Sequence, residues 1–216
     1  MKYTVAAVAA IFLLSSSAVF AAKPDNNPGK GGGEDFEPIP GLVCIDPGHG
    51  GTDTGAVNAD LLEKNVNLKV AFFLQDRLKA GGYTATLTRT DDSTLSNADR
   101  YSHCNNERAE VLISIHHNGS SDPSVDYSLA LYMTNEDVPL AQTVVDTVSA
   151  QLELPNKGVS KFASGVLLKS KMPATISEGF FLTNSTEYNL IKNGTRLEDE
   201  ADALFDAITA YFAANP

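Results

Sequence analysis

Short apolar runs alternate along the chain with longer stretches in which apolar residues recur at helical spacing. The runs at 42–45 and 111–115 are almost wholly apolar, which is typical of strands buried on both faces of a sheet. Between these runs, apolar residues recur every fourth position and a glycine pair follows: Val66, Val70, Leu74, Leu78, then Gly81-Gly82. This spacing predicts a helix from about residue 62 to the glycine pair.

The rest of the chain continues the alternation of strands and helices. We expect further strands over 83–89, 127–133, 165–168 and 174–177. We expect further helices over 95–108, over 136–152 and from Asn184 to about Phe212, the last opened by capping-box spacing at 184–187. This order predicts a single α/β domain over residues 41–216, with a mostly parallel, twisted sheet flanked by helices.

The first forty residues have a different composition. Lys2, the apolar run 6–14 and the small residues before Ala21 form the pattern of a secretory signal peptide cleaved after Ala21. The alternative is a membrane anchor, but the run is shorter than the roughly 20 residues that a span needs. Residues 22–40 are rich in Pro, Gly and charge, which predicts a flexible leader. We therefore expect an exported protein, located in the periplasm or outside the cell.

The net charge limits which binding partners are plausible, and the two cysteines allow a disulfide bond. The chain carries a net charge of −11, and removing Lys2, the one charge in residues 1–21, leaves −12. This balance argues against nucleic acid or an anionic membrane surface as a partner and leaves a glycan or peptide substrate open. Cys44 and Cys104 can form a disulfide after export, or each can be a small buried hydrophobic residue. We expect a monomer without a membrane span after signal removal.

Polar residues stand next to the predicted strands. His49 and His116 follow the two buried runs, and Glu178 ends the strand at 174–177. Ligands gather at the carboxyl ends of strands in open α/β sheets, so these side chains should meet. Glu63 heads the apolar stripe of the first helix, where its carboxylate needs a neutralising partner unless the helix dipole alone stabilises it.

Two imidazoles and one carboxylate form a zinc ligand set that leaves a fourth tetrahedral position for water. His49, Glu63 and His116 lie too far apart in sequence for the helical His-Glu-x-x-His arrangement. These three residues are therefore the candidate ligands for one zinc ion per chain, and the residues around them decide the interpretation.

The sequence around these residues resembles the zinc-dependent N-acetylmuramoyl-L-alanine amidases of the amidase 3 type. The resemblance runs from about Leu42 to the C-terminus, in motifs at 46–56 (DPGHGGTDTGA), 63–68 (EKNVNL), 87–91 (LTRTD), 95–100 (LSNADR), 114–118 (SIHHN) and 173–178 (PATISE). It implies His49, Glu63 and His116 as zinc ligands and Glu178 as the catalytic glutamate. It also implies peptidoglycan as substrate, cut between the muramic acid lactyl group and L-alanine.

The chain departs from the family pattern before Glu63, where residues 60–62 lack the usual glycine, at Ser177, which replaces an apolar residue, and at two further places near the site. His117 stands where the family often has a small residue, and we expect it to be an exposed neighbour of the metal or a substrate contact. The segment 178–181 reads Glu-Gly-Phe-Phe where the family has Glu-x-Gly-Phe, so Phe180 fills the place of the glycine.

Supporting residues have simpler expected roles. Asp46 should accept backbone N–H bonds in its loop, with a metal role as the alternative. Asn118 should anchor its loop or touch substrate, Arg100 should be an ion-pair partner, and His103 should lie on the surface.

Two other functions compete with the amidase interpretation. One is a different zinc peptidoglycan hydrolase, a carboxypeptidase or a deacetylase. The other is a non-catalytic wall-binding domain. The second predicts a lost ligand or a lost glutamate, and this sequence keeps all four residues.

Overall fold

The computed structural model describes residues 36–216 of the 216-residue chain. The expected signal peptide, and the leader up to residue 35, lie outside the described residues. The end of the leader lies against the domain, where the Ile39 N–H donates to the Arg108 carbonyl at 2.8 Å.

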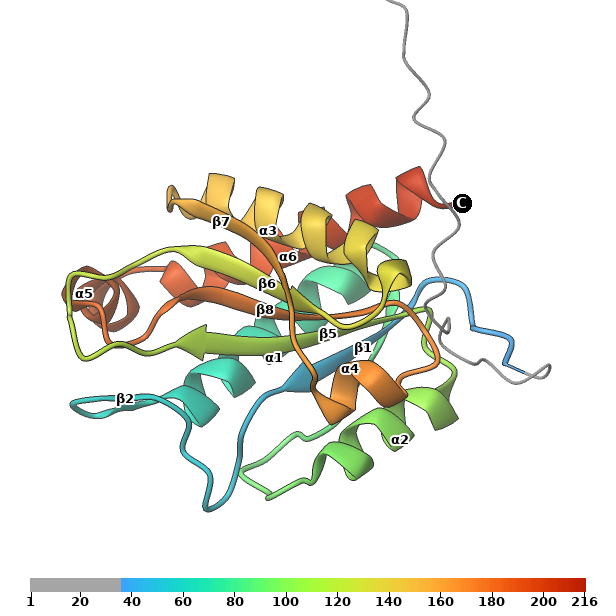
Figure 1. Cartoon of the computed structure of the whole chain (residues 1–216), viewed down its shortest axis with the longest axis horizontal. Coiled ribbons are helices and arrows are strands. Elements are labelled where there is room, and N and C mark those ends of the chain that lie inside the picture. The colour runs from blue at the N-terminus through green and yellow to red at the C-terminus, as the bar shows by residue number, and fades with distance from the viewer. Residues whose placement is uncertain (1–35) are drawn as a thin grey trace, which may run out of the picture.

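A six-stranded sheet forms the centre of the domain (Figure 1). In spatial order its strands are β4 (Thr84–Leu87), β1 (Leu42–Pro47), β5 (Val111–Asn118), β8 (Ala174–Phe181), β6 (Ser128–Tyr132) and β7 (Asn156–Lys161). Neighbouring strands are parallel except for the antiparallel pair β6–β8. The sheet is therefore mostly parallel, as the alternating pattern predicts.

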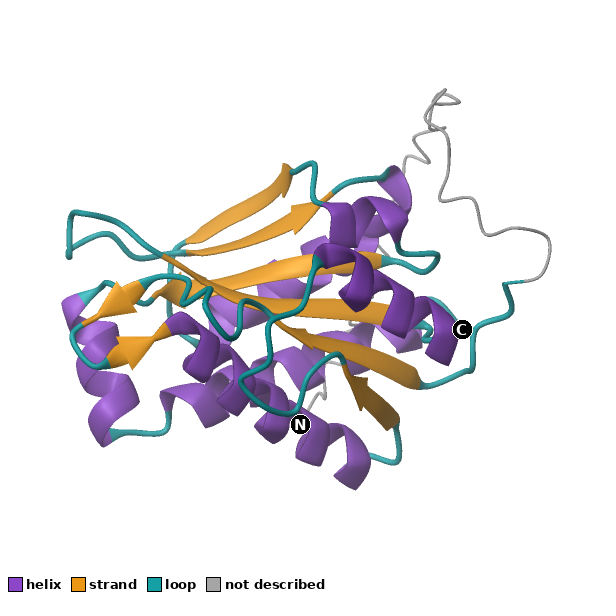
Figure 2. Ribbon diagram, turned by 90° about the horizontal axis from the view of Figure 1, so that it is seen from below, coloured by secondary structure: helices purple, strands orange, loops and turns teal. Residues whose placement is uncertain are grey.

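Helices cover both faces of the sheet (Figure 2). The helices are α1 (Glu63–Ala80), α2 (Asn97–Glu107), α3 (Val138–Gln151), α4 (Gly165–Lys169), α5 (Ser185–Asn193) and α6 (Arg196–Ala214), with a 3-10 turn η1 (Asn135–Asp137) before α3. Val43 and Ile45 of β1 pack with α1, α3 and α6, whereas Leu42 and Cys44 pack with α2 and α4. The apolar runs of the sequence are thus buried on both sides.

A disulfide joins Cys44 of β1 to Cys104 of α2, with their Cα atoms 5.6 Å apart. It settles the alternative that the sequence left open between a bridge and two small buried hydrophobic residues. The bond lies on the side of the sheet that α2 and α4 cover.

Several predicted elements were wrong in type or extent. Residues 165–168 form α4 rather than a strand, because the Ser164 hydroxyl accepts the Val166 N–H and begins a helix. The predicted last helix divides at Gly194 into α5 and α6, although Asn184 caps α5 as expected. The edge strand β7 and the small hairpin of β2 (Val57–Asn58) and β3 (Leu61–Leu62) were not predicted. Their polar or very short sequences carry little strand signal.

Two strands also extend further than expected. β5 continues to Asn118 and β8 to Phe181, so His116 and Glu178 lie within strands, directly paired in register, rather than after strand ends. Between His116 and Asn118 the register shifts, because β8 contains one more residue than β5 over this stretch. The extra residue forms a β-bulge in β8. The bulge places residues 179 and 180 opposite His117.

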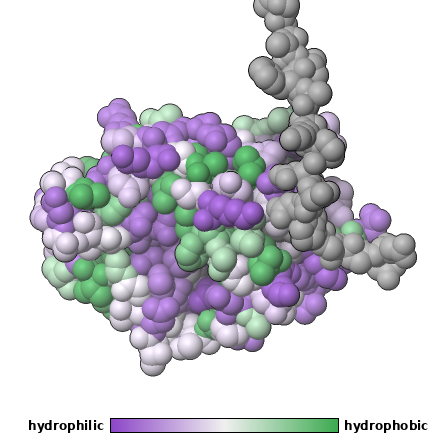
Figure 3. All heavy atoms as spheres, in the orientation of Figure 1, coloured by the Kyte–Doolittle hydropathy of each residue, from purple (hydrophilic) through white to green (hydrophobic). Residues whose placement is uncertain are grey.

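Within residues 36–216, no helix combines the length and the apolar character that a membrane span needs. Figure 3 shows the face that carries α2 and α4, where hydrophobic residues gather in several small patches. Scattered patches of this kind are ordinary on a protein surface.

Candidate metal centre

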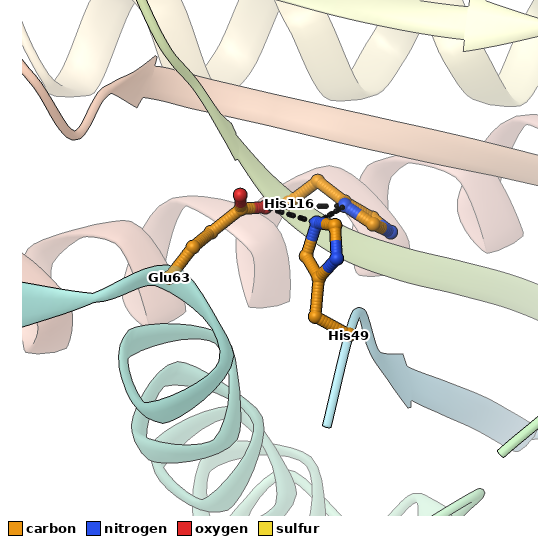
Figure 4. Close-up of side chains that lie close together, drawn as sticks. All are labelled: His49, Glu63 and His116. Carbon is orange, nitrogen blue, oxygen red and sulfur yellow. Dashed lines mark hydrogen bonds and ion pairs between the residues drawn. The ribbon is translucent and has the colours of Figure 1, made fainter. Parts of the chain in front are cut away.

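Three side chains from three elements meet at one point (Figure 4). His49 lies in the loop after β1, Glu63 is the first residue of α1, and His116 belongs to β5. Glu63 Oε1 lies 3.0 Å from His49 Nε2 and 3.2 Å from His116 Nδ1, and the two nitrogens are 3.1 Å apart. Donors bound to one tetrahedral zinc at about 2.0–2.1 Å lie roughly 3.3–3.4 Å from each other. The three side chains therefore fit one zinc ion with small adjustments.

The loop that carries His49 is held in an unusual conformation. His49 has φ of +59°, a left-handed value that few non-glycine residues adopt. Arg100 Nη2 donates to the His49 carbonyl at 2.7 Å, and Arg89 Nη2 donates to the Gly48 carbonyl at 2.9 Å. A Cβ atom at Gly48 would lie 2.2 Å from His116 Nε2, so the absence of a side chain lets the imidazole lie against this loop. Two buried arginines and one glycine fix the position of His49.

Asp46 anchors the same loop through side chains rather than through the backbone N–H bonds that the sequence suggested. Its buried carboxylate accepts hydrogen bonds from Thr88 Oγ1 at 2.6 Å, Ser114 Oγ at 2.7 Å and Arg100 Nη1 at 2.7 Å. Burial acts to raise the pKa of Asp46, but Arg100 and the two hydroxyls outweigh it and hold the pKa below its ordinary value. Asp46 is not among the converging donors, and Arg100 is its ion-pair partner, as expected.

Two of the converging side chains, those of His49 and Glu63, have further hydrogen-bond partners. Asp53 Oδ2 lies 2.8 Å from His49 Nδ1, which is the carboxylate–histidine arrangement common behind metal ligands. Glu63 Oε2 accepts the Ala56 N–H at 2.7 Å, and Oε1 accepts the His117 N–H at 3.0 Å. The free rotation of both side chains is therefore removed by their neighbours.

The electrostatics of the cluster favour a cation. Burial lowers the pKa of His49, but hydrogen bonds and charge interactions with Glu63 and Asp53 outweigh it and raise the pKa to about 9. Burial acts to raise the pKa of Glu63, whereas His116 and His49 hold it far below its ordinary range. The Glu63 carboxylate thus stays ionised and draws positive charge to the point where the three donors meet.

Glu178 lines the same cavity, which has a volume of about 540 Å³. It lies beside His116 in the β5–β8 register. Burial is the main cause that raises the pKa of Glu178, and the nearby Glu63 adds to it, while His116 and His117 oppose the shift. A carboxyl group with a raised pKa, adjacent to three candidate ligands, is suited to accept and return a proton.

The remaining wall of the cavity is mostly apolar. Its apolar members are Ala56, Leu129, Leu131, Phe162 and Ile176. Asn118 also lines the cavity, and its Nδ2 group is buried without a hydrogen-bond partner among the described residues. The Asn118 backbone carbonyl accepts the Leu182 N–H at 2.8 Å, and the role of the Asn118 side chain stays a prediction.

His117 is the clearest correction to the sequence interpretation. It is 2 % exposed rather than an exposed neighbour of the metal. Successive residues of a strand face opposite sides, so its ring points away from His116 toward α1 and α6. There Nδ1 lies 2.7 Å from Asn67 Oδ1 and Nε2 lies 2.8 Å from Glu200 Oε2. His103 is half-buried rather than on the surface, with Nε2 2.8 Å from Thr86 Oγ1.

Sequence reasoning assigned no role to Asp53 and Asn67, which lie next to candidate ligands, or to Glu200, which lies next to His117. Asn67 stands four positions after Glu63 on the predicted helix, so its spacing carried a local signal, whereas Asp53 follows His49 in a loop, where the same spacing carries none. Glu200 is 83 residues from the histidine that it contacts and gave no such signal.

The chain is similar to known proteins over most of its length. Residues 43–210 match the family model described as N-acetylmuramoyl-L-alanine amidase. The amidase LytC of Bacillus subtilis is 32% identical over 174 residues, which is 79% of this chain and 35% of LytC. YqiI of the same organism, an uncharacterized protein, is 32% identical over 82% of this chain and 87% of its own length. The chain thus spans about a third of LytC but most of YqiI.

A solved structure shows the same architecture. The crystal structure of an N-acetylmuramoyl-L-alanine amidase from Clostridium difficile 630 aligns with a TM-score of 0.76 and 31% identity. The alignment covers 81% of this chain and 98% of that one.

Proposed function

This chain belongs to the N-acetylmuramoyl-L-alanine amidase family, and on that premise we propose that it hydrolyses the amide bond between N-acetylmuramic acid and L-alanine in bacterial peptidoglycan. We further propose that the reaction uses one zinc ion held by His49, Glu63 and His116. The convergence of these three donors beside Glu178 in one cavity is the observation that carries the proposal. The named activities of LytC and of the Clostridium difficile enzyme support it.

In the proposed amide hydrolysis, the metal ligands, Glu178 and Asn118 have separate roles. Zinc, when bound, supplies Lewis-acid activation of the attacking water and of the scissile carbonyl. Glu178 accepts the proton of the attacking water and later delivers it to the leaving amine of L-alanine. Its buried position keeps the pKa raised, which makes the carboxylate a stronger base toward the attacking water. Asn118 lines the cavity, and its Nδ2 group, which has no hydrogen-bond partner among residues 36–216, is suited to donate to a carbonyl of the bound substrate.

Export of the protein is part of the same proposal. The substrate lies outside the cytoplasm, and the expected signal peptide at 1–21 would carry the chain to it. The Cys44–Cys104 disulfide supports this location, because such bonds persist in oxidising compartments.

Metal analysis combined with product analysis tests the proposal. The purified mature protein should contain one zinc per chain by elemental analysis and should release stem peptides beginning with L-alanine from peptidoglycan, as read by mass spectrometry. Loss of a terminal D-alanine would instead indicate a carboxypeptidase, and loss of acetyl groups a deacetylase. Binding to peptidoglycan without any product would indicate a wall-binding domain.

A further inference from the structure

A buried polar cluster lies directly behind the candidate metal centre. It consists of Asn67 from α1, His117 from β5 and Glu200 from α6, whose exposed fractions are 0 %, 2 % and 0 %. The imidazole of His117 connects the other two, at 2.7 Å from Asn67 Oδ1 and 2.8 Å from Glu200 Oε2. Polar groups at this depth are costly unless each one is paired, so the cluster needs an explanation.

The hydrogen-bond pattern fixes the orientation of the Asn67 amide. Its Nδ2 group donates to the Gly48 carbonyl at 3.1 Å and toward Glu63 Oε1 at 3.4 Å. Its Oδ1 atom therefore faces His117, and His117 Nδ1 must carry the proton of that bond. Nε2 of the same ring then shares a proton with the Glu200 carboxyl group.

The neighbouring strand is shaped to admit this cluster. A Cβ atom at Gly179 would lie 2.2 Å from Glu200 Oε1, so only glycine leaves room for that carboxyl group. The Phe180 ring packs against His117 with 4.1 Å between ring centroids. Both positions lie in the β8 bulge. Two of the departures from the resembled sequence pattern, at 117 and at 179–180, therefore meet in one place.

The cluster ends on a proposed zinc ligand. Glu63 Oε1 accepts the backbone N–H of His117 at 3.0 Å and faces the Asn67 amide. If the His117 ring were absent, the Asn67 amide could rotate, and Glu63 would lose a fixed donor. Glu200 would at the same time lose its only hydrogen-bond partner among the described residues.

We propose that Asn67, His117 and Glu200 form a positioning network that holds the Glu63 carboxylate in the geometry for zinc. His117 is the central positioning residue, because it orients Asn67 on one side and is itself oriented by Glu200 on the other. This inference rests on the proposed zinc site. Loss of a group behind a metal ligand typically weakens metal affinity about 10–100-fold.

Two amide substitutions at position 117 separate positioning from stability. Asparagine places its Nδ2 near the former Nδ1, so His117→Asn keeps a donor for Asn67 and loses the partner of Glu200. Glutamine reaches the former Nε2, so His117→Gln keeps the partner of Glu200 and loses the donor for Asn67. We expect His117→Asn to bind zinc within a few-fold of wild type despite a lower melting temperature. We expect His117→Gln to bind about 10–100-fold more weakly despite the smaller loss of stability.

The measurement is the zinc dissociation constant of the mature protein by competition with a chelator, together with its melting temperature. The absorption spectrum of the cobalt-substituted protein is a second readout, and it should change in His117→Gln but not in His117→Asn. Gly82→Ala is the control, because its left-handed φ of +85° strains the backbone just after α1, where no neighbour lies within 4 Å. It should lower the melting temperature and leave zinc affinity unchanged.

Equal zinc affinity and equal cobalt spectra in both position-117 variants would overturn the proposal and leave the cluster a packing element. If neither variant folds, Asn67→Ala decides, because it removes the amide without leaving a charge buried. Wild-type zinc affinity in Asn67→Ala would then overturn the proposal, and a loss of about 10–100-fold would support it. A wild-type protein that binds no zinc would instead refute the proposed metal site itself.

Discussion

At the residue scale, His116 and Glu178 are neighbours on adjacent strands with different surroundings. His116 Nδ1 faces Glu63 and His49, whereas the Glu178 carboxyl group lines the cavity without joining the converging donors. The first arrangement suits a metal ligand and the second suits a proton carrier. Substitution at each position should therefore have a different effect.

Replacing Glu178 should slow turnover by orders of magnitude and leave the metal bound. Glu178→Ala should keep one zinc per chain, because the three donors remain, and should lose roughly 10²–10⁴-fold in hydrolysis rate. Elemental analysis and the release of stem peptides measure the two effects. Hydrolysis near the wild-type rate would remove Glu178 from the mechanism.

Replacing His116 should remove the metal. His116→Ala leaves two donors, His49 and Glu63, which are too few for a stable tetrahedral site. Elemental analysis after dialysis should find almost no zinc, while the melting temperature of the metal-free protein should stay close to that of metal-free wild type. One zinc still bound per chain would contradict the ligand assignment.

Asp46 should matter for stability and for its dependence on pH. Because the folded-state pKa lies below the ordinary 3.8, the contribution of Asp46 is complete above pH 3.8 and is lost as the pH falls through the folded pKa. Asp46→Asn leaves Arg100 buried without its carboxylate and should cost roughly 3–5 kcal/mol of unfolding free energy. Urea denaturation from about pH 7 to pH 2 should show a flatter acid slope for the variant. Parallel acid slopes for the two proteins would contradict this role.

Local sequence signals predicted the three candidate ligands and Glu178, which the structure brings together or into one cavity. Their roles in zinc binding and catalysis stay predictions. The burial of His117 was not predicted, because its partner Glu200 is distant in sequence. The predicted strand also ended at residue 115, whereas β5 continues to Asn118, so His117 faces the side opposite to His116.

At the element scale, long apolar patterns were more informative than short ones. The helix α1 and the strands β1 and β5 follow from runs with a clear period or a fully apolar sequence. The five residues of α4 are too few to show a helical repeat of apolar residues, and the polar edge strand β7 shows no alternation of apolar and polar residues. The bulge in β8 depends on pairing with β5, which a single sequence does not specify.

The close approach of the first loop to β5 gives a prediction at this scale. A Cβ atom at Gly48 would lie 2.2 Å from the His116 ring, so Gly48→Ala should displace the ring and weaken zinc affinity by more than about tenfold. Chelator competition measures the effect. Gly82→Ala is the control, because its φ of +85° strains the backbone where no neighbour lies within 4 Å. The control should lose about 1 kcal/mol of stability and keep wild-type zinc affinity.

At the scale of the whole molecule, alternation of strands and helices was sufficient to predict the layered α/β domain. It did not give the strand order or the antiparallel β6–β8 pair, because these depend on which strands meet across the sheet. The disulfide between β1 and α2 could not be predicted from the sequence either, because its formation depends on the distance between two elements.

The disulfide should stabilise the whole domain without being needed for the metal. It closes a loop of 60 residues, so its loss should cost about 2–5 kcal/mol, chiefly because the unfolded chain gains freedom. The ion pair between Arg100 of α2 and Asp46 of β1 links the same two elements, and Arg100 also holds the His49 carbonyl. The folded domain should therefore keep the loop that carries His49 when the disulfide is absent.

The double variant Cys44→Ala/Cys104→Ala tests this better than a thiol reductant, because reductants bind zinc themselves. Urea denaturation should show a lower midpoint for the variant, and elemental analysis in the absence of urea should still find one zinc per chain. An unchanged midpoint would mean that the disulfide adds nothing to stability. Loss of zinc from the folded variant would mean that the bond, rather than the Asp46–Arg100 pair, keeps α2 aligned with β1 at the metal centre.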